Sequence, residues 1–254
     1  MAPIPSLGAV LEDSYVVNTI GYNFQIKHRS HVRQLAGIPT EPHLTVIRRN
    51  RFVKAEGASL KVAARPNVLI GDLPLQGPGK GDDCAIYRNL FFHNPGEALF
   101  QGEGGFALYR YLFFNSHSPG FPAIAIQPHS DIPRRVGVFH NTVVTPGRGI
   151  RVLTGPGQDP AQQRVVANAV FANTPIQGGH LGRNWVKRFV AAAESLENPV
   201  PDLRSMSLKP LPGVLLRNPS GIARFAAYPD FDRDYEGRVP THLTVGAYAL
   251  PIGQ

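Results

Sequence analysis

Residues 85–92 read AIYRNLFF: apolar side chains alternate, an Asn follows, and a second apolar run begins directly after it. The same phrase recurs along the chain, once with Tyr in the Asn position. The copies lie at residues 45–53, 106–114, 136–144 and 164–171, with a weaker copy at 10–17. Alternation over short runs predicts β-strands, and repetition at this interval predicts stacked units that bury their apolar faces against one another.

A second short apolar strand follows most copies of the phrase. These strands are expected at residues 24–28, 67–70, 98–101, 123–127 and 149–153. Because insertions in a stacked fold lie in outer loops, the variable spacing of the marker residues is compatible with one solenoid. We expect an all-β fold, a right-handed parallel β-helix of about five or six coils within residues 1–180. The recurring Asn residues are expected at its corners, with left-handed backbone and stacked amides.

The sequence of the last part of the chain predicts a cap over the end of the coils. Apolar residues in the segment 184–196 recur at helical spacing, and Pro199 lies just beyond them. We expect a capping helix there, and an irregular tail that wraps back along the coils. Residues 181–254 would then belong to the same domain as the coils.

The composition limits the partners. The 254 residues carry a formal net charge of +8, which favours anionic partners, although it also serves solubility. The basic residues are scattered, and no apolar run is long enough to span a membrane, so we expect neither nucleic acid nor a membrane as a partner. The single Cys84 excludes an internal disulfide, and we expect it to be a buried structural thiol in a monomer.

Several phrases resemble a known family. IYRNLFFHNPGEALFQGEG at 86–104, FALYRYLFFNS at 106–116, VGVFHNTVVTPGRGIRV at 136–152 and RVVANAVFA at 164–172 look like coils of bacterial β-helix repeat proteins. Together they resemble the pectate-lyase-like superfamily of right-handed parallel β-helix proteins, over roughly residues 9–180. The resemblance implies a secreted or periplasmic protein, although Met1–Gly8 shows no signal peptide.

Polar residues gather on the predicted outer face of the second strands. We align these strands on their last inward apolar residues, Ile26, Ile70, Phe100, Ile126 and Val152. Outward positions then hold polar side chains suited to sugar hydroxyls, and basic ones suited to carboxylates. The expected substrate-binding residues are His28, Gln101, Gln127, His129 and Arg151.

The resemblance also implies an activity. Alginate lyase and chondroitinase B-like members abstract a proton from a uronic acid with a Lys base, and Lys27 stands in a similar phrase. Arg65 would act on the leaving oxygen, and Glu103, between glycines, would face the ligand. We therefore expect a polysaccharide lyase acting on acidic polysaccharide.

Two other functions remain open. The first is a carbohydrate-binding solenoid without catalysis. The second is a glycoside hydrolase in which Glu97 and Glu103 form a carboxyl pair, which requires a separation of about 5–9.5 Å. Calcium is a possible cofactor: Asp82 and Asp83 follow a glycine-rich loop and offer weak calcium binding, or else a solvated loop. No acidic cluster for calcium is evident around Lys27.

Overall fold

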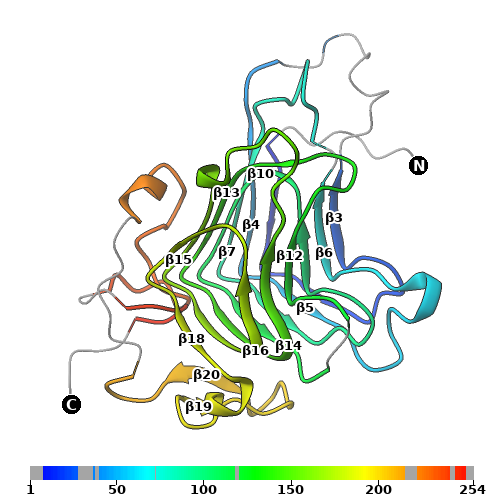
Figure 1. The fold of residues 1–254 in the computed structure, drawn as a ribbon. Helices are drawn as coiled ribbons and strands as arrows, with labels where there is room; N and C mark the ends of the chain where they lie inside the picture. The colour runs from blue at the N-terminus through cyan, green and yellow to red at the C-terminus, as the bar shows by residue number, and fades with distance from the viewer. Residues whose placement is uncertain are drawn as a thin grey trace.

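The computed structural model describes residues 8–27, 37, 40–71, 73–117, 120–214, 222–240 and 244–249. They form mostly parallel strands in two curled sheets, an arrangement compatible with a β-helix or solenoid (Figure 1). The seven-stranded sheet has the order β1 (Val10–Glu12), β4 (Leu44–Arg48), β7 (Asp83–Tyr87), β10 (Gly104–Tyr109), β13 (Pro133–Phe139), β15 (Gln163–Val166), β17 (His180–Gly182).

The larger sheet has eleven strands and bends along its length. Its main path runs through β2 (Tyr15–Val17), β5 (Arg51–Val53), β8 (Leu90–Phe92), β11 (Leu112–Phe114), β14 (Thr142–Val152), β12 (Ile124–Ile126), β9 (Phe100–Gly102), β6 (Val68–Gly71) and β3 (Phe24–Lys27). Two further strands, β16 (Ala169–Gln177) and β18 (Trp185–Lys187), extend it from β14. Long β14 therefore joins the two arms of the sheet.

Each strand of the seven-stranded sheet leads directly into a strand of the larger one, and we call such a pair a rung. The described residues form seven rungs, from β1–β2 to β17–β18, where about five or six coils were expected. The weak copy at 10–17 is the first rung. The last rung ends at Lys187, beyond residue 180, where the sequence predicted the repeat to stop.

Matched register places apolar side chains of successive rungs on one another. Leu11 pairs with Ile47, which pairs with Ile86, and the column continues to Leu181. The rings of Phe52, Phe91 and Phe113 stack inside with centroid distances of 5.2 and 4.8 Å. Because full burial of such a side chain stabilises by about 1.5–3 kcal/mol, these columns hold the rungs together.

The predicted Asn corner exists, with one correction. Asn50 donates from its backbone N–H and from Nδ2 to Asn89 Oδ1, both at 2.8 Å, so the amides form a ladder. The left-handed residue is the one before each ladder residue, not the Asn itself. The positive φ angles belong to Asp13, Arg49, Arg88, Arg110, His140, Ala167 and Arg183. The ladder hydrogen bonds offset the cost of this backbone conformation.

The predicted capping helix is wrong. Its segment contains strand β18, a 3-10 turn η4 (Phe189–Ala192) and strand β19 (Leu196–Asn198), which pairs with β20 (Ser207–Pro210) in an antiparallel hairpin. The described ranges contain no helix of seven or more residues; the other 3-10 turns are η2 (Lys61–Ala63), η3 (Pro160–Gln162) and η5 (Ala223–Phe225). The apolar residues at helical spacing serve two surfaces: Val186 ends an interior column, whereas Ala192 and Leu196 pack on the outside.

The C-terminal part of the chain covers two outer faces. Outward rings of Tyr87, Tyr109 and Phe139 stack along the seven-stranded sheet, and Phe225 stacks on Phe139 at 4.1 Å. Below, η4 and the β19–β20 hairpin pack on the outer side of β14 and β16 (Figure 1). Both of these outer faces therefore form a second apolar cluster.

Within the described residues, no helix has the length and apolar character needed to cross a lipid bilayer.

Candidate functional site

A third outer face is built by β3, β6, β9, β12 and the ends of β14 and β16, and we call it the third-strand face. It lies on the side of the stack away from the C-terminal tail (Figure 1). Strand register arranges its outward positions in two columns. The first column reads Gln25, Leu69, Gln101, Ala125, Arg151, Gln177, and the second reads Lys27, Gly71, Glu103, Gln127, Leu153.

This register corrects the alignment of one strand. Phe100 pairs with Val68 and Ile124, so Gly102 stands in the inward column of Ile70 that was assigned to Phe100. A Cβ atom on Gly102 would lie 2.6 Å from the Phe106 ring and 2.8 Å from the Phe100 ring. The two rings fill the core where a larger residue was expected.

The shift moves residues between the columns. Gln101 shares a column with Arg151, and Glu103 shares the column of Lys27 and Gln127. Sequence reasoning missed two members of the face, Gln25 and Gln177. The available signal was the alternation of Gln25 with Lys27.

Three predicted binding residues do come together. Arg151 Nη2 donates to Gln127 Oε1, which links the two columns. Gln101 lies two strands from Arg151, with only the small Ala125 between them. Gln101, Gln127 and Arg151 are all half-buried, so each has part of its surface in solvent. The cluster offers amide groups and a guanidinium on one uncrowded patch.

Glu97 borders this patch beside three cations. It is half-buried, and its Oε1 accepts the Ala98 N–H at 2.8 Å. Burial raises the pKa of the Glu97 carboxyl, and the charges of Arg65, Lys54 and Arg151 lower that pKa. The neighbourhood is therefore net basic.

Lys54 is a buried cation beneath the same corner. Its Nζ bonds Gly21 O at 2.7 Å, Arg65 O at 2.8 Å and Ser59 Oγ at 2.9 Å. Burial lowers the pKa of Lys54 to about 8. These bonds tie the loop before β6 to the stack, which gives Lys54 a structural role that the sequence did not predict.

The structure does not bring Lys27 and Arg65 together. Arg65 is exposed before the start of β6, and its guanidinium bonds the carbonyls of Val62 and Ala64 at 3.1 and 2.6 Å. Lys27 ends β3 and pairs with Gly71 at the far end of β6. Four strand residues span about 13 Å, so the two side chains start from opposite ends of the face.

Glu103 is buried rather than directed at solvent, with 2% of its surface exposed. Its Oε2 accepts the backbone N–H groups of His129, Ser130 and Asp131 at 2.8, 3.1 and 3.1 Å. Successive N–H groups of this kind form a nest that binds an anion. Glu103 thus holds the turn that presents His129.

The remaining predicted residues lie around this turn. His129 is exposed, with Nδ1 3.0 Å from Ser130 Oγ, and His28 lies outside the described residues. Glu97 precedes β9 and Glu103 follows it, with their carboxyl groups tied at opposite ends of the strand. Six extended residues span about 20 Å, which does not fit a hydrolase pair.

The candidate calcium residues are engaged in the fold. Asp82 Oδ1 accepts the His43 N–H at 2.9 Å, and Asp83 Oδ2 accepts the Tyr228 hydroxyl at 2.8 Å. Among the described residues there is no group of three or more His, Cys, Asp or Glu suited to a metal ion. Cys84 is buried as predicted, and burial raises the pKa of its thiol.

No protein-family model, no curated protein and no solved structure matches this chain.

Proposed function

We propose that this protein is a right-handed parallel β-helix of the pectate-lyase-like kind that binds an acidic polysaccharide along its third-strand face. The observation that carries the proposal is the difference between the outer faces. The chain covers two of them with its own apolar residues, and the third carries Gln25, Gln101, Arg151, Gln177 and Gln127. A location outside the cytoplasm, secreted or periplasmic, goes with this proposal.

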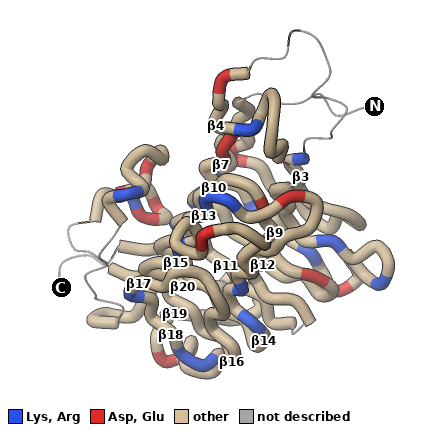
Figure 2. Tube along the Cα trace, turned by 45° about the horizontal axis from the view of Figure 1, so that its top comes forward, with Lys and Arg blue, Asp and Glu red and all other residues tan. Residues whose placement is uncertain are grey.

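The chemistry of the face suits such a ligand. Amide side chains donate to and accept from sugar hydroxyls, and a guanidinium binds a carboxylate through two parallel hydrogen bonds. Arg151 already donates to the carbonyl oxygen of Gln127 and stands near Glu97. The net charge of +8 attracts polyanions, and Figure 2 shows that basic positions are spread over several elements, among them β14.

Binding is supported better than catalysis because the two proposed catalytic side chains start far apart. β-Elimination at a uronic acid needs a base at C5 and a proton donor at the leaving oxygen, both within hydrogen-bond reach. Lys27 and Arg65 lie at opposite ends of β6. A lyase with Lys27 as its base is the second candidate, because Lys27 shares its outward column with Gln127 on this face.

Binding to alginate, pectate, chondroitin, dermatan and heparin tests the proposal, with neutral dextran as the comparison. Arg151→Ala is expected to weaken binding by about tenfold or more, because a charge-assisted contact is lost. Added salt should weaken the wild type more than the variant. The matched control is Arg204→Ala, which removes an exposed arginine from the β19–β20 connection. Equal binding by Arg151→Ala and the wild type would refute the proposed face.

Catalysis is read separately from the ultraviolet absorbance of unsaturated uronates, with and without calcium. If the chain is a lyase, the absorbance rises on one of the acidic polysaccharides and Lys27→Ala abolishes the rise. Binding without any rise leaves a carbohydrate-binding solenoid.

A further inference from the structure

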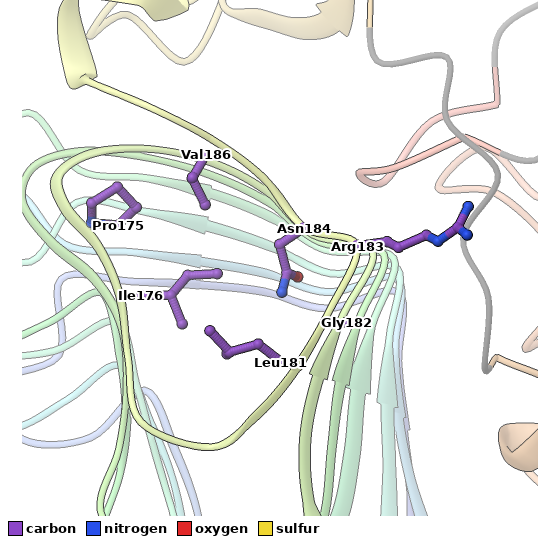
Figure 3. A pocket seen from close by; sticks show the side chains of 7 residues that line it. All are labelled: Pro175, Ile176, Leu181, Gly182, Arg183, Asn184 and Val186. Atoms are coloured by element: carbon purple, nitrogen blue, oxygen red, sulfur yellow. The ribbon is translucent and has the colours of Figure 1, made fainter.

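In the part of the chain that the structure describes, the last rung leaves the interior of the stack open. β17 is the end strand of its sheet, and β18 pairs with β16 on one side only. A hollow of about 350 Å³ lies inside this rung, lined by Ile176, Leu181, Asn184 and Val186 among others (Figure 3). Exposed parallel edges of this kind normally need a cap or a partner.

The open rung exposes side chains that are buried elsewhere in the same columns. Leu181 is 55% exposed, although Val165, its neighbour in the column, is fully buried. Val186 is 48% exposed, although Val170 beneath it is fully buried. Directly after β18 the described residues do not turn over the opening, since η4 packs back on β14 and β16.

The first rung presents the matching set of side chains. Leu11 and Val16 begin the columns that end at Leu181 and Val186. Beside them, Val10 and Tyr15 are each 59% exposed. A first rung placed on a last rung would continue both parallel sheets with the same strand direction and the same column order.

The two ends of the stack also carry complementary charges at the corner. The column of left-handed corner residues, one from each rung, begins with Asp13 in the first rung and ends with Arg183 in the last. Within the chain, Arg49 binds Asp13 through Nε at 2.9 Å and Nη2 at 2.6 Å. Arg183 stands in the same column as Arg49, so a first rung stacked on the last would bring another Asp13 one rung away from it. The ends also differ in charge, with Glu12 and Asp13 at one and Arg183 and Lys187 at the other.

The polar ladder continues in the same way. Each ladder Asn accepts the backbone N–H of the ladder residue one rung before it, from Ser14 to Asn50 and from Asn168 to Asn184. Ser14 occupies the ladder position of the first rung, and its hydroxyl oxygen can accept the N–H that Asn184 presents.

We propose that the last rung accepts the first rung of a second copy of this chain, so that the protein assembles head to tail. This departs from the monomer expected from the sequence. The contact joins two different surfaces by a repeating step, so it does not close and each added copy leaves a new open end. Linear chains that lengthen with protein concentration follow from it.

Sedimentation velocity of the full chain over a wide concentration range tests the proposal. The wild type should form dimers and then longer species as concentration rises. Arg183→Asp places like charges at the junction and should lower the association constant on the order of a hundredfold. Arg204→Asp, at an exposed site that does not line the hollow, is the matched control and should associate as the wild type does.

A mixing experiment fixes the geometry. Asp13→Arg alone should also fail to assemble, and an equimolar mixture with Arg183→Asp should assemble again, because every junction then pairs opposite charges. Circular dichroism and thermal unfolding check that both variants fold, and both should fold as the wild type does. A wild type that stays monomeric at every concentration overturns the proposal. So does a closed dimer whose variants are not rescued by mixing, since that result indicates contact between identical ends.

Discussion

Asn184 Oδ1 accepts two hydrogen bonds from Asn168, one from the backbone N–H and one from Nδ2, both at 2.9 Å. The same two-bond contact joins Asn50 to Asn89 and Asn141 to Asn168. Each carboxamide therefore links the backbone of two rungs at a buried corner. Because a slip of one residue would turn every core side chain outward, this contact also fixes the register of the rungs.

Asn168→Ala should lower the free energy of unfolding by about 3 kcal/mol or more, because it leaves several buried donors and acceptors without partners. Asn168 Nδ2 also donates to Val138 O at 2.9 Å, and its Oδ1 accepts two bonds from Asn141. Chemical denaturation measures the change. Asn198→Ala removes a single exposed bond to Ser205 O and should change stability by less than about 1 kcal/mol. Equal losses from the two variants would argue against the ladder as a major source of stability.

The repeat could be read from the sequence because one chemical requirement recurs at most of the corners. An amide at Asn50, Asn89, Asn141 and Asn168 and alternating apolar residues around it mark most of the rungs, whereas Ser14 and Tyr111 hold this position in two others. The capping helix was wrongly predicted for the segment 184–196 because its apolar residues, which pack against two different surfaces, happen to have the spacing of an apolar helix face. Val186 continues an interior column, a role that only strand pairing with β16 reveals.

The burial of His140 is expected to make the protein less stable in acid. It is fully buried beside the buried Arg110 guanidinium, and both burial and that charge hold the pKa of His140 well below its ordinary 6.5. Below pH 6.5 the unfolded chain binds a proton that the folded one does not, so the free energy of unfolding falls as pH falls. The slope from this residue is about 1.4 kcal/mol per pH unit. Above pH 6.5 His140 is neutral in both the folded and the unfolded chain, so no stability is lost to its protonation there.

Denaturation of His140→Gln as a function of pH measures this slope. Below pH 6.5 the free energy of unfolding of the variant should fall less steeply with falling pH than that of the wild type. The difference in slope should correspond to the uptake of about one fewer proton on unfolding. His93, whose pKa burial lowers to about 4, keeps its own contribution in both proteins, so the difference isolates His140. His129→Gln is the control, since that ring is exposed. Parallel pH profiles for the wild type and His140→Gln would contradict the assignment.

Gly137 leaves room for the ring that anchors the tail. A Cβ atom at this position would lie 2.6 Å from Cε1 of Phe225, which stacks on Phe139 at 4.1 Å. Gly137→Ala should therefore displace Phe225 and speed proteolysis and hydrogen exchange in residues 222–240. Phe225→Ala should have the same effect and lower the free energy of unfolding by about 3–5 kcal/mol.

Gly57→Ala is the matched control for Gly137→Ala, because no atom lies within 4 Å of its Cβ position. Its proteolysis pattern should match the wild type. Unchanged protection of the tail in Gly137→Ala would show that the Phe225 ring adjusts without leaving the sheet.

The candidate face was harder to predict than the rungs. Polar outward positions carry no periodic requirement, so one misaligned strand, β9, moved Gln101 by two residues. Gln25 was missed separately, because it stands before the inward residue Ile26 and only positions after the inward residues were compared. The error arose at Gly102, where the Phe100 and Phe106 rings replace a side chain in the core. Glu103 between glycines resembled a ligand-facing carboxylate, and only the fold of the following rung shows the three N–H groups that it accepts.

Glu103 and Gly71 form a pair whose role can be separated from catalysis. A Cβ atom at Gly71 would lie 2.7 Å from Glu103 Oε1, and that carboxylate cannot move aside without losing its bonds to the turn at 129–131. Glu103→Ala should lower the free energy of unfolding by about 3 kcal/mol or more, since hydrogen bonds to a charged group are lost at a buried site. Gly71→Ala should lower it by about 1–3 kcal/mol through crowding.

The double variant Gly71→Ala/Glu103→Ala tests whether the two residues act through direct contact. Once Glu103→Ala has removed the carboxylate, Gly71→Ala meets no obstacle, so its effect on the free energy of unfolding should fall close to zero. Such strong non-additivity is expected only of groups in direct contact. If the two effects instead add, crowding against Glu103 is not the reason why Gly71→Ala lowers the free energy of unfolding. If Glu103→Ala leaves stability unchanged but alters polysaccharide turnover, the carboxylate acts on a ligand and its bonds to the turn are secondary.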